Sequence, residues 1–324
     1  MTPHDSQPPA VGFGPILLVC ALAGVVVIGA ALTLGRGPDE PATAVPPMAT
    51  EDYGRRLLTE TTVLLGQDHP DPERRFIGNR LQCGSCHLDA GTEPGTLSLL
   101  QAFDRYPRFS GRDGGDRDIR DRINGCMTRS MNGRPLPVDS PEMIAMAAYV
   151  RSLQDQYDAM GATRRAEDEP APFETPDRRA DPDAGKRVFD DRCATCHGAD
   201  GLGLPATTDL RDGYLFPPLW GPDSFNDGAG MHRVLTAARF IKARMPLGQP
   251  DLTDDEAFDV AAYINVQPRP QMAGLEADYP DKATKPVDSP YGPWADPFPA
   301  EQHKLGPFRP IEEWYKAQKA SAPR

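Results

Sequence analysis

Two copies of one five-residue pattern constrain this 324-residue chain more than any other feature of its sequence. The copies are CGSCH, with Cys83, Cys86 and His87, and CATCH, with Cys193, Cys196 and His197. The cysteines of each copy stand three positions apart, within reach of the two vinyl groups of a porphyrin, and the adjacent histidine can place a ring nitrogen under the iron. A structural zinc site or disulfides are the alternative, but zinc ribbons pair their CxxC motifs at about 15–20 residues. We therefore predict two covalently bound haem c groups, with His87 and His197 as iron ligands.

Net charge and cysteine content narrow the possible functions. The formal net charge is −12, which argues against a nucleic-acid partner and gives no general attraction to anions, so any anion site must be local. Of the 6 cysteines, four belong to the two motifs, Cys20 lies in an apolar run, and Cys126 is left over. Most free cysteines are buried and inert, but a lone thiol outside the cytoplasm is open to oxidation unless it is protected or used.

An uncharged run from Ile16 to Leu34 is long enough to cross a bilayer as a helix. We predict that residues 1–35 form an uncleaved N-terminal transmembrane helix, because no Lys or Arg precedes the run and no clear cleavage site follows it. A cleaved signal peptide is the alternative. Since haem c is attached outside the bacterial inner membrane, the body is predicted to lie on the periplasmic face of that membrane, behind a tether at residues 36–50 that is rich in Pro, Ala and Thr.

The rest of the chain is predicted to be mainly α, with two tandem cytochrome c-type haem domains. Apolar periodicity predicts a helix over residues 51–66, and the segments after Ser140 and Thr253, which are plausible N-caps, both contain Ala-Ala-Tyr followed by Val or Ile. This recurrence indicates an internal duplication. The predicted division is domain 1 at 51–153, a linker at 154–180, domain 2 at 181–270, and a long proline-rich C-terminal tail at 271–324 that wraps the body.

We expect the second iron ligand of each haem to lie in the loop before the last helix of its domain. For haem 2 this residue is Met245, with His232, Met231 and Lys242 as weaker alternatives. A thioether ligand raises the potential of a haem and suits electron transfer. For haem 1 the equivalent position is Met131, but Cys126 lies five residues upstream, and spacing alone leaves both candidates open.

Arginines are concentrated between residues 105 and 134, around these two candidates. Arginine offers planar, forked donors for oxyanions, so such a cluster in an acidic protein indicates a local anion pocket. Salt bridges to haem propionates or to the aspartates nearby are the alternative for about half of them. Arg112 and Arg122, which flank the approach to Cys126, are the candidates for anion binding. The arginines of this segment stand at positions 105, 108, 112, 117, 120, 122, 129 and 134.

Several longer segments resemble the tetrathionate-forming thiosulfate dehydrogenases, which are dihaem cytochromes c. The resemblance covers roughly residues 51–311. Its segments are Gly78–Cys83, His87–Gly91, Asp121–Cys126, Arg129–Gly133, Phe216–Gly221, Phe240–Lys242 and Gln302–Phe308.

This resemblance implies that Cys126 is the distal ligand of haem 1 and that Arg112 and Arg122 bind substrate, with Ser130 as a weaker candidate. Some members carry Lys directly before the methionine of haem 2 and exchange ligands with redox state. Here that position is Arg244, which cannot supply a neutral amine, so we do not expect the exchange, although Lys242 stays open.

The implied reaction joins two thiosulfates into tetrathionate. Two electrons would pass through haem 1 to haem 2 and on to an external partner, such as a small cytochrome c or a membrane acceptor. The chemistry on Cys126 would be nucleophilic catalysis if its thiolate bonds to a thiosulfate sulfur. The alternatives are a membrane-tethered dihaem electron carrier without its own substrate, and the same site working mainly as a tetrathionate reductase.

Overall fold

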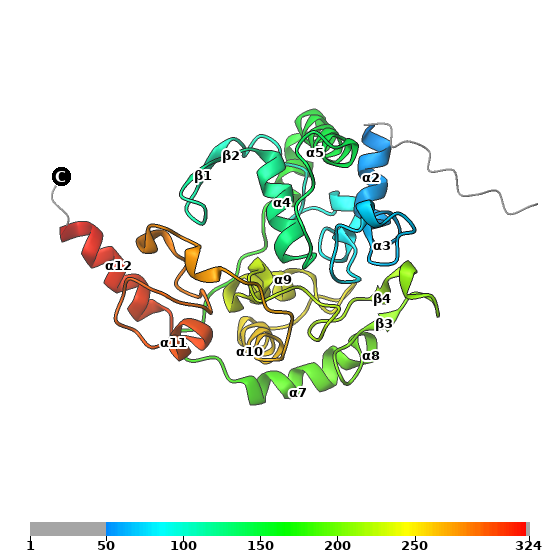
Figure 1. The fold of residues 1–324 in the computed structure, drawn as a ribbon. Coiled ribbons are helices and arrows are strands. Elements are labelled where there is room, and N and C mark those ends of the chain that lie inside the picture. Colours follow the sequence, from blue (N-terminus) through cyan, green and yellow to red (C-terminus); the bar gives the residue numbers. More distant parts are fainter. Residues whose placement is uncertain (1–49, 322–324) are drawn as a thin grey trace, which may run out of the picture. The chain divides into compact units, whose positions relative to one another are not determined.

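The computed structural model describes residues 50–321 of the chain (Figure 1). The predicted membrane helix at residues 1–35 and the tether up to residue 49 lie outside the described residues. Within residues 50–321, no helix combines the length and the apolar character that a membrane span requires.

Helices account for most of the regular structure, and the strands form two short antiparallel pairs, which confirms the predicted mainly helical class. In the first half the elements are α2 (Glu51–Thr59), α3 (Thr61–Leu65), β1 (Arg108–Ser110), β2 (Gly115–Arg117), α4 (Ile119–Arg129), α5 (Pro141–Ala159) and α6 (Ala162–Glu167). In the second half they are α7 (Pro182–Arg192), α8 (Ala194–His197), β3 (Leu204–Pro205), β4 (Tyr214–Phe216), α9 (Val234–Arg244) and α10 (Asp254–Asn265). The tail adds α11 (Ala300–Leu305) and α12 (Arg309–Ser321).

The helix expected over residues 51–66 is broken into α2 and α3 at Glu60. The buried Thr61 hydroxyl donates to the Leu57 carbonyl at 2.7 Å, a side-chain bond that competes with the helical ladder. The same hydroxyl oxygen accepts the backbone N–H of Cys83 at 3.1 Å. The Thr61 hydroxyl at this break therefore also holds the start of the first cysteine motif.

Helices α2 and α5 cross at Gly54, where a Cβ atom would lie 2.1 Å from the Ala145 carbonyl oxygen and 2.6 Å from Tyr149 Cβ. Only glycine fits so close an approach of two backbones. Ser140 caps α5 as predicted, since its hydroxyl accepts the Met143 N–H at 3.2 Å.

The second half repeats this crossing between α7 and α10. A Cβ at Gly185 would lie 2.0 Å from the Asp259 carbonyl oxygen and 2.9 Å from Tyr263 Cβ. Thr253 and Glu256 form a reciprocal capping box at the start of α10. The two helix crossings therefore show the same internal duplication that the Ala-Ala-Tyr segments indicate.

Each half of the chain has its own apolar core, and each core includes residues from another part of the chain. The first core, around Leu57, Met127 and Met143, includes Phe225 and Ala229 from the second half. The second core includes tail residues from α11 to α12. These tail residues are Leu305, Phe308 and Ile311.

Polar contacts also join the halves. The Asn226 side chain donates to the Thr128 carbonyl in the last turn of α4 at 2.9 Å and to Asn132 Oδ1 just after the helix at 3.1 Å. Asn79, fully buried, donates to the Ser130 carbonyl at 2.8 Å and to the Ser224 carbonyl at 3.1 Å. The end of α4 is therefore fixed from both halves of the chain.

Candidate active site

The first cysteine motif ends in a histidine whose orientation is fixed. His87 Nδ1 lies 2.8 Å from the Leu97 carbonyl oxygen. Burial lowers the pKa of His87, so the imidazole stays neutral near pH 7 and its Nδ1–H donates to this carbonyl. The Nε2 lone pair is then left for a metal, which is the arrangement common to histidine ligands of metals.

The second motif repeats the arrangement with different partners. His197 Nδ1 lies 2.8 Å from the Pro217 carbonyl oxygen, and burial lowers the pKa of His197. Both motif histidines thus bond to a backbone carbonyl supplied by a loop that follows the motif.

The thiols of the motifs are partly buried and unpaired within residues 50–321. Cys83, Cys86, Cys193 and Cys196 are free, so the disulfide alternative does not hold for them. Burial raises the pKa of Cys83 to about 11 and that of Cys86 to about 12. Such thiols carry no charge that the protein must stabilise, and they fit conversion into the two thioethers of haem c.

A cavity of about 710 Å³ opens beside the first motif. This volume is within the usual range of cofactor sites, about 300–1,000 Å³. Its wall is formed by Cys83, Cys86 and His87, by the β1–β2 hairpin, by α4, by the segment before α9, and by the tail. The cavity brings together every residue predicted for the first haem and its substrate, namely Cys83, Cys86, His87, Arg112, Arg122, Cys126 and Ser130.

Cys126 lies in α4, partly buried, one helical turn after Arg122. Because residues four apart share a helix face, the guanidinium and the sulfur are neighbours. The charge of Cys126 is the largest cause of the raised pKa of Arg122. Met131, the competing sulfur ligand, also lines the cavity but is 2 % exposed and belongs to the first core. Cys126 as the iron ligand stays a prediction.

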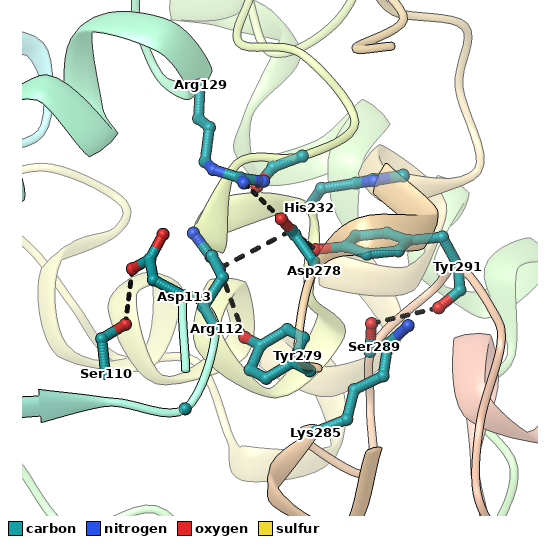
Figure 2. Close-up of polar contacts among 12 residues, drawn as sticks. Ser110, Arg112, Asp113, Arg129, His232, Asp278, Tyr279, Lys285, Ser289 and Tyr291 are labelled. Carbon is teal, nitrogen blue, oxygen red and sulfur yellow. Dashed lines mark hydrogen bonds and ion pairs between the residues drawn. The ribbon is translucent and has the colours of Figure 1, made fainter. Parts of the chain in front are cut away.

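The two predicted anion-binding arginines differ in their surroundings. Within residues 50–321, the Arg122 side chain has no hydrogen bond or ion pair. Arg112, in the turn between β1 and β2, is held from the tail: its Nε donates to the Tyr279 hydroxyl at 3.4 Å and lies 3.9 Å from Asp278 Oδ2 (Figure 2). One cation is free and the other is fixed.

Arg129 is a third guanidinium at the cavity. It donates to Asp278 Oδ1 at 2.7 Å and to the Gly228 carbonyl at 3.1 Å, so the tail and the second half hold it (Figure 2). Arg108 and Arg117 also line the cavity, whereas Arg105, Arg120 and Arg134 do not. The arginine-rich segment therefore divides between the cavity and the surface, as expected.

Tail residues at this cavity were missed by the sequence reasoning. Tyr279 and Thr284 line it, and Asp278 lies directly behind Arg112 and Arg129. These positions lie more than 140 residues from α4, and no spacing or periodicity links them to it. The tail segment that carries the family resemblance lies further along the chain, at residues 302–308.

The candidates for the second ligand of haem 2 are also placed. Met245 is the C-cap of α9 and packs on the second core. Lys242 Nζ donates to the Leu252 carbonyl at 2.6 Å, and both ring nitrogens of His232 lie against backbone carbonyls. Met231 lines the first cavity instead. Met245 has no such competing polar bond and stays the predicted ligand.

Arg244, directly before Met245, reaches the first half. Its Nη1 lies 2.9 Å from Glu93 Oε1, with the Arg244 side chain 14 % exposed. Its Nε and Nη2 atoms are buried and have no hydrogen-bond partner among residues 50–321. The ion pair between Arg244 and Glu93 therefore joins the methionine loop of the second half to the first half.

Comparisons with known proteins agree with this geometry. Residues 77–156 match the family described as SoxA/TsdA, cytochrome c domain, and residues 180–264 match the family described as cytochrome C oxidase, cbb3-type, subunit III. The two domains, each with its cysteine motif and fixed histidine, bind covalent haem c. The chain is therefore a dihaem cytochrome c.

Similar proteins narrow the class further. A thiosulfate dehydrogenase of Allochromatium vinosum is 43% identical over 67% of this chain and 77% of its own length. Another, of Psychrobacter arcticus, is 41% identical over 63% of this chain and 61% of its own. The solved thiosulfate dehydrogenase (TsdBA) of Marichromatium purpuratum superposes with a TM-score of 0.61 at 33% identity, over 76% of this chain and 52% of that chain. The present chain thus spans about half of that structure. It belongs to the thiosulfate dehydrogenase family.

Proposed function

We propose that this chain oxidises thiosulfate to tetrathionate, according to 2 S₂O₃²⁻ → S₄O₆²⁻ + 2 e⁻. The observation that carries the proposal is the cavity at the first cysteine motif, where Cys126 lies beside Arg122, which has no partner within residues 50–321, and where Arg112 also lines the wall. The proposal is supported by family membership and by the names of the curated relatives. Each haem c, when bound, accepts one electron at a time, so two haems match the electron count.

The first task of the residues is to bring two dianions together. Two such ions 4 Å apart repel each other by about 4 kcal/mol even at the dielectric constant of water. The net charge of −12 adds to this repulsion. Arg112 and Arg122 offset it locally, and their forked N–H groups match the oxygens of a sulfonate. Ser130, which also lines the cavity, offers a further hydroxyl donor.

Cys126 is proposed as the nucleophile and as the distal ligand of the first haem. Its thiolate and the terminal sulfur of one thiosulfate form a disulfide bond, Cys–S–S–SO₃⁻, with release of two electrons. The terminal sulfur of a second thiosulfate then attacks the sulfur of this adduct that carries the sulfonate. The Cys126 S–S bond breaks, tetrathionate leaves, and the thiolate is restored.

The second half is proposed to pass the electrons on. His197 and Met245 would hold its haem, and the fastening of Arg244 to Glu93 keeps the methionine loop in place. The acceptor is proposed to be a small cytochrome c or a membrane acceptor, with the protein anchored to the periplasmic face of the inner membrane by its N-terminal segment.

Replacement of Cys126 by glycine tests the proposal. We expect thiosulfate-dependent reduction of an acceptor to fall by more than about 100-fold, as expected when a nucleophile is lost. The oxidised spectrum of the first haem should lose its thiolate character at the same time. Met131→Leu serves as the control, with activity and spectrum expected to stay near those of the parent. Full activity of Cys126→Gly would contradict the proposal, and wild-type protein inactive with both thiosulfate and tetrathionate would favour an electron carrier.

A further inference from the structure

The C-terminal tail fixes the turn that carries Arg112. The Tyr279 N–H donates to the Arg112 carbonyl at 2.7 Å. The Thr284 hydroxyl donates to the Asp281 carbonyl at 2.8 Å and lies 3.4 Å from the Gly111 carbonyl. A Cβ at Gly114 would lie 3.1 Å from the Pro280 ring. The tip of the β1–β2 hairpin is therefore in close contact with tail residues from a distant part of the sequence.

Tyr279 is the aromatic tail residue in the cavity wall. Its side chain is buried, with 6 % of the residue exposed, and it lines the cavity wall. The Arg112 guanidinium carbon lies 5.7 Å from the centre of its ring, and Lys285 Nζ lies 5.9 Å from the same centre (Figure 2). Both cations lie within the range of attraction to an aromatic ring. The ring has little freedom to move.

The backbone of Tyr279 is strained. Its φ angle is +56°, in the left-handed region that bulky residues rarely adopt. Such a conformation persists only where the surroundings impose it, and it is found mostly at functional sites. Here the left-handed conformation allows the Tyr279 N–H to bond to the Arg112 carbonyl while Tyr279 lines the cavity.

The Tyr279 hydroxyl has a proton to offer. Its oxygen accepts from Arg112 Nε at 3.4 Å, and within residues 50–321 the phenol donates to no acceptor. Asp278 next to it is already occupied: its carboxylate accepts from Arg129 at 2.7 Å and from the Tyr291 hydroxyl at 2.7 Å (Figure 2). A free O–H on a residue that lines a cavity together with several arginines suits an oxyanion.

We propose that Tyr279 is a substrate-binding residue, whose hydroxyl donates to a sulfonate oxygen of the thiosulfate held by Arg112. This inference rests on the proposed function. It also assigns a role to Asp278: as a positioning residue it holds Arg112 and Arg129 in place. The anion site would then be built from both the hairpin of the first half and the tail.

The variant Tyr279→Phe tests the inference in the haem-loaded protein, because it removes the hydroxyl and keeps the ring between its two cations. We expect the KM for thiosulfate to rise about tenfold, as for loss of one hydrogen bond to a charged group. Calorimetric titration with sulfate, a tetrahedral dianion without the reactive sulfur, should show a similar loss of affinity. Tyr315→Phe is the control: Tyr315 donates to Asp296 at 2.7 Å in the same tail and does not line the cavity. Its KM and sulfate affinity should stay within about twofold of the parent values.

Three outcomes would overturn the inference. The first is a Tyr279→Phe protein whose KM and sulfate affinity match the parent. The second is a shift in the reduction potential of the first haem without a change in affinity, which would assign the hydroxyl to a haem propionate. The third is a parent protein that binds neither anion, which would reject the proposed function as well. A parent protein that does not oxidise thiosulfate, but loses sulfate affinity in Tyr279→Phe, would reject the proposed function and leave this inference standing.

Discussion

Arg112 and Arg122 reach the same cavity with different degrees of freedom. Arg112 is held by Tyr279 and Asp278, so its position is set before an anion arrives. Cys126 is the group that acts most strongly on the charge of Arg122, and the Arg122 side chain has no hydrogen bond within residues 50–321. A free guanidinium beside a sulfur is suited to follow an anion as that anion approaches the sulfur, whereas a fixed one is suited to define where an anion rests.

The variant Arg122→Gln is expected to lower kcat/KM for thiosulfate by about 10- to 100-fold, as for loss of a hydrogen bond to a charged group. Steady-state assays with an artificial acceptor measure this. Arg120→Gln removes the same charge two residues away, where Arg120 pairs with Asp118 at 2.6 Å on the surface. Equal losses in both variants would show that the effect comes from overall charge and not from the site.

His232 predicts a pH dependence of stability. Its Nδ1 lies 2.8 Å from the Asp227 carbonyl and its Nε2 lies 3.2 Å from the Asn265 carbonyl. Burial, with a smaller contribution from the charge of Arg269, lowers the pKa of His232 to about 4. The unfolded chain protonates this histidine near pH 6.5, so acidification favours unfolding between pH 6.5 and about 4.

We expect the His232 contribution to reduce the free energy of unfolding by about 2 kcal/mol at pH 5 relative to pH 7.5. Urea unfolding of the haem-loaded protein at the two pH values measures the change. His232→Gln should make the difference between the two pH values smaller by that amount, while His69→Gln, near the surface, should not. An unchanged difference in His232→Gln would show that other groups cause the dependence.

At the level of elements, the helix crossings could be predicted only in part. The caps Ser140 and Thr253 and the helices that follow them were correctly predicted, because capping and apolar periodicity are local signals. The break at Glu60 was not, because it depends on the Thr61 hydroxyl, which bonds to the motif 22 residues later. The β1–β2 hairpin was not predicted either, because its strands have no apolar alternation and tail residues hold its turn.

Gly185→Ala tests the α7–α10 crossing. The new Cβ would meet the Asp259 carbonyl oxygen at 2.0 Å, a backbone atom that cannot turn aside. We expect a loss of about 3 kcal/mol in the free energy of unfolding, at the upper end for overpacked sites. Thermal melts followed at the haem absorbance would record it. Gly161→Ala, where a Cβ meets nothing within 4 Å, is the control. A small effect at Gly185 would mean that the two helices can separate without loss of packing.

At the level of the whole molecule, charge is distributed unevenly. The chain carries a net charge of −12, whereas the cavity of the first half is lined by arginines. The overall charge acts over the range at which a partner approaches, and salt screens it with a Debye length of about 10 Å at 0.1 M. The local arginines act on a substrate that has already entered.

The overall charge predicts opposite salt effects for two kinds of acceptor. With saturating thiosulfate, reduction of a basic small cytochrome c should slow several-fold as ionic strength rises from about 0.02 to 0.2 M. Reduction of ferricyanide, an anion, should speed up under the same change. Stopped-flow measurements with both acceptors make the comparison. The same response from both would show that docking is governed by a local patch.

The distal ligand could be proposed only through the resemblance. Met131 and Cys126 are both near enough in sequence, and the structure places both at the cavity. The tail residues Asp278 and Tyr279 were beyond prediction, because nothing local in the tail indicates where it will dock. Sequence reasoning therefore reaches the groups that lie on one helix or in one motif, and it misses those that only long-range folding brings together.

The docking of the tail also sets an order of assembly. Tyr279 lies after both cysteine motifs in the chain, and the tail beyond it packs into the second core through Leu305 and Phe308. Because Tyr279 is synthesised after both motifs, the proposed anion pocket of the first half cannot be complete before both cysteine motifs have been made. The chemistry proposed for Cys126 would then have its full set of anion-binding groups only after the segments that hold both haems have been synthesised.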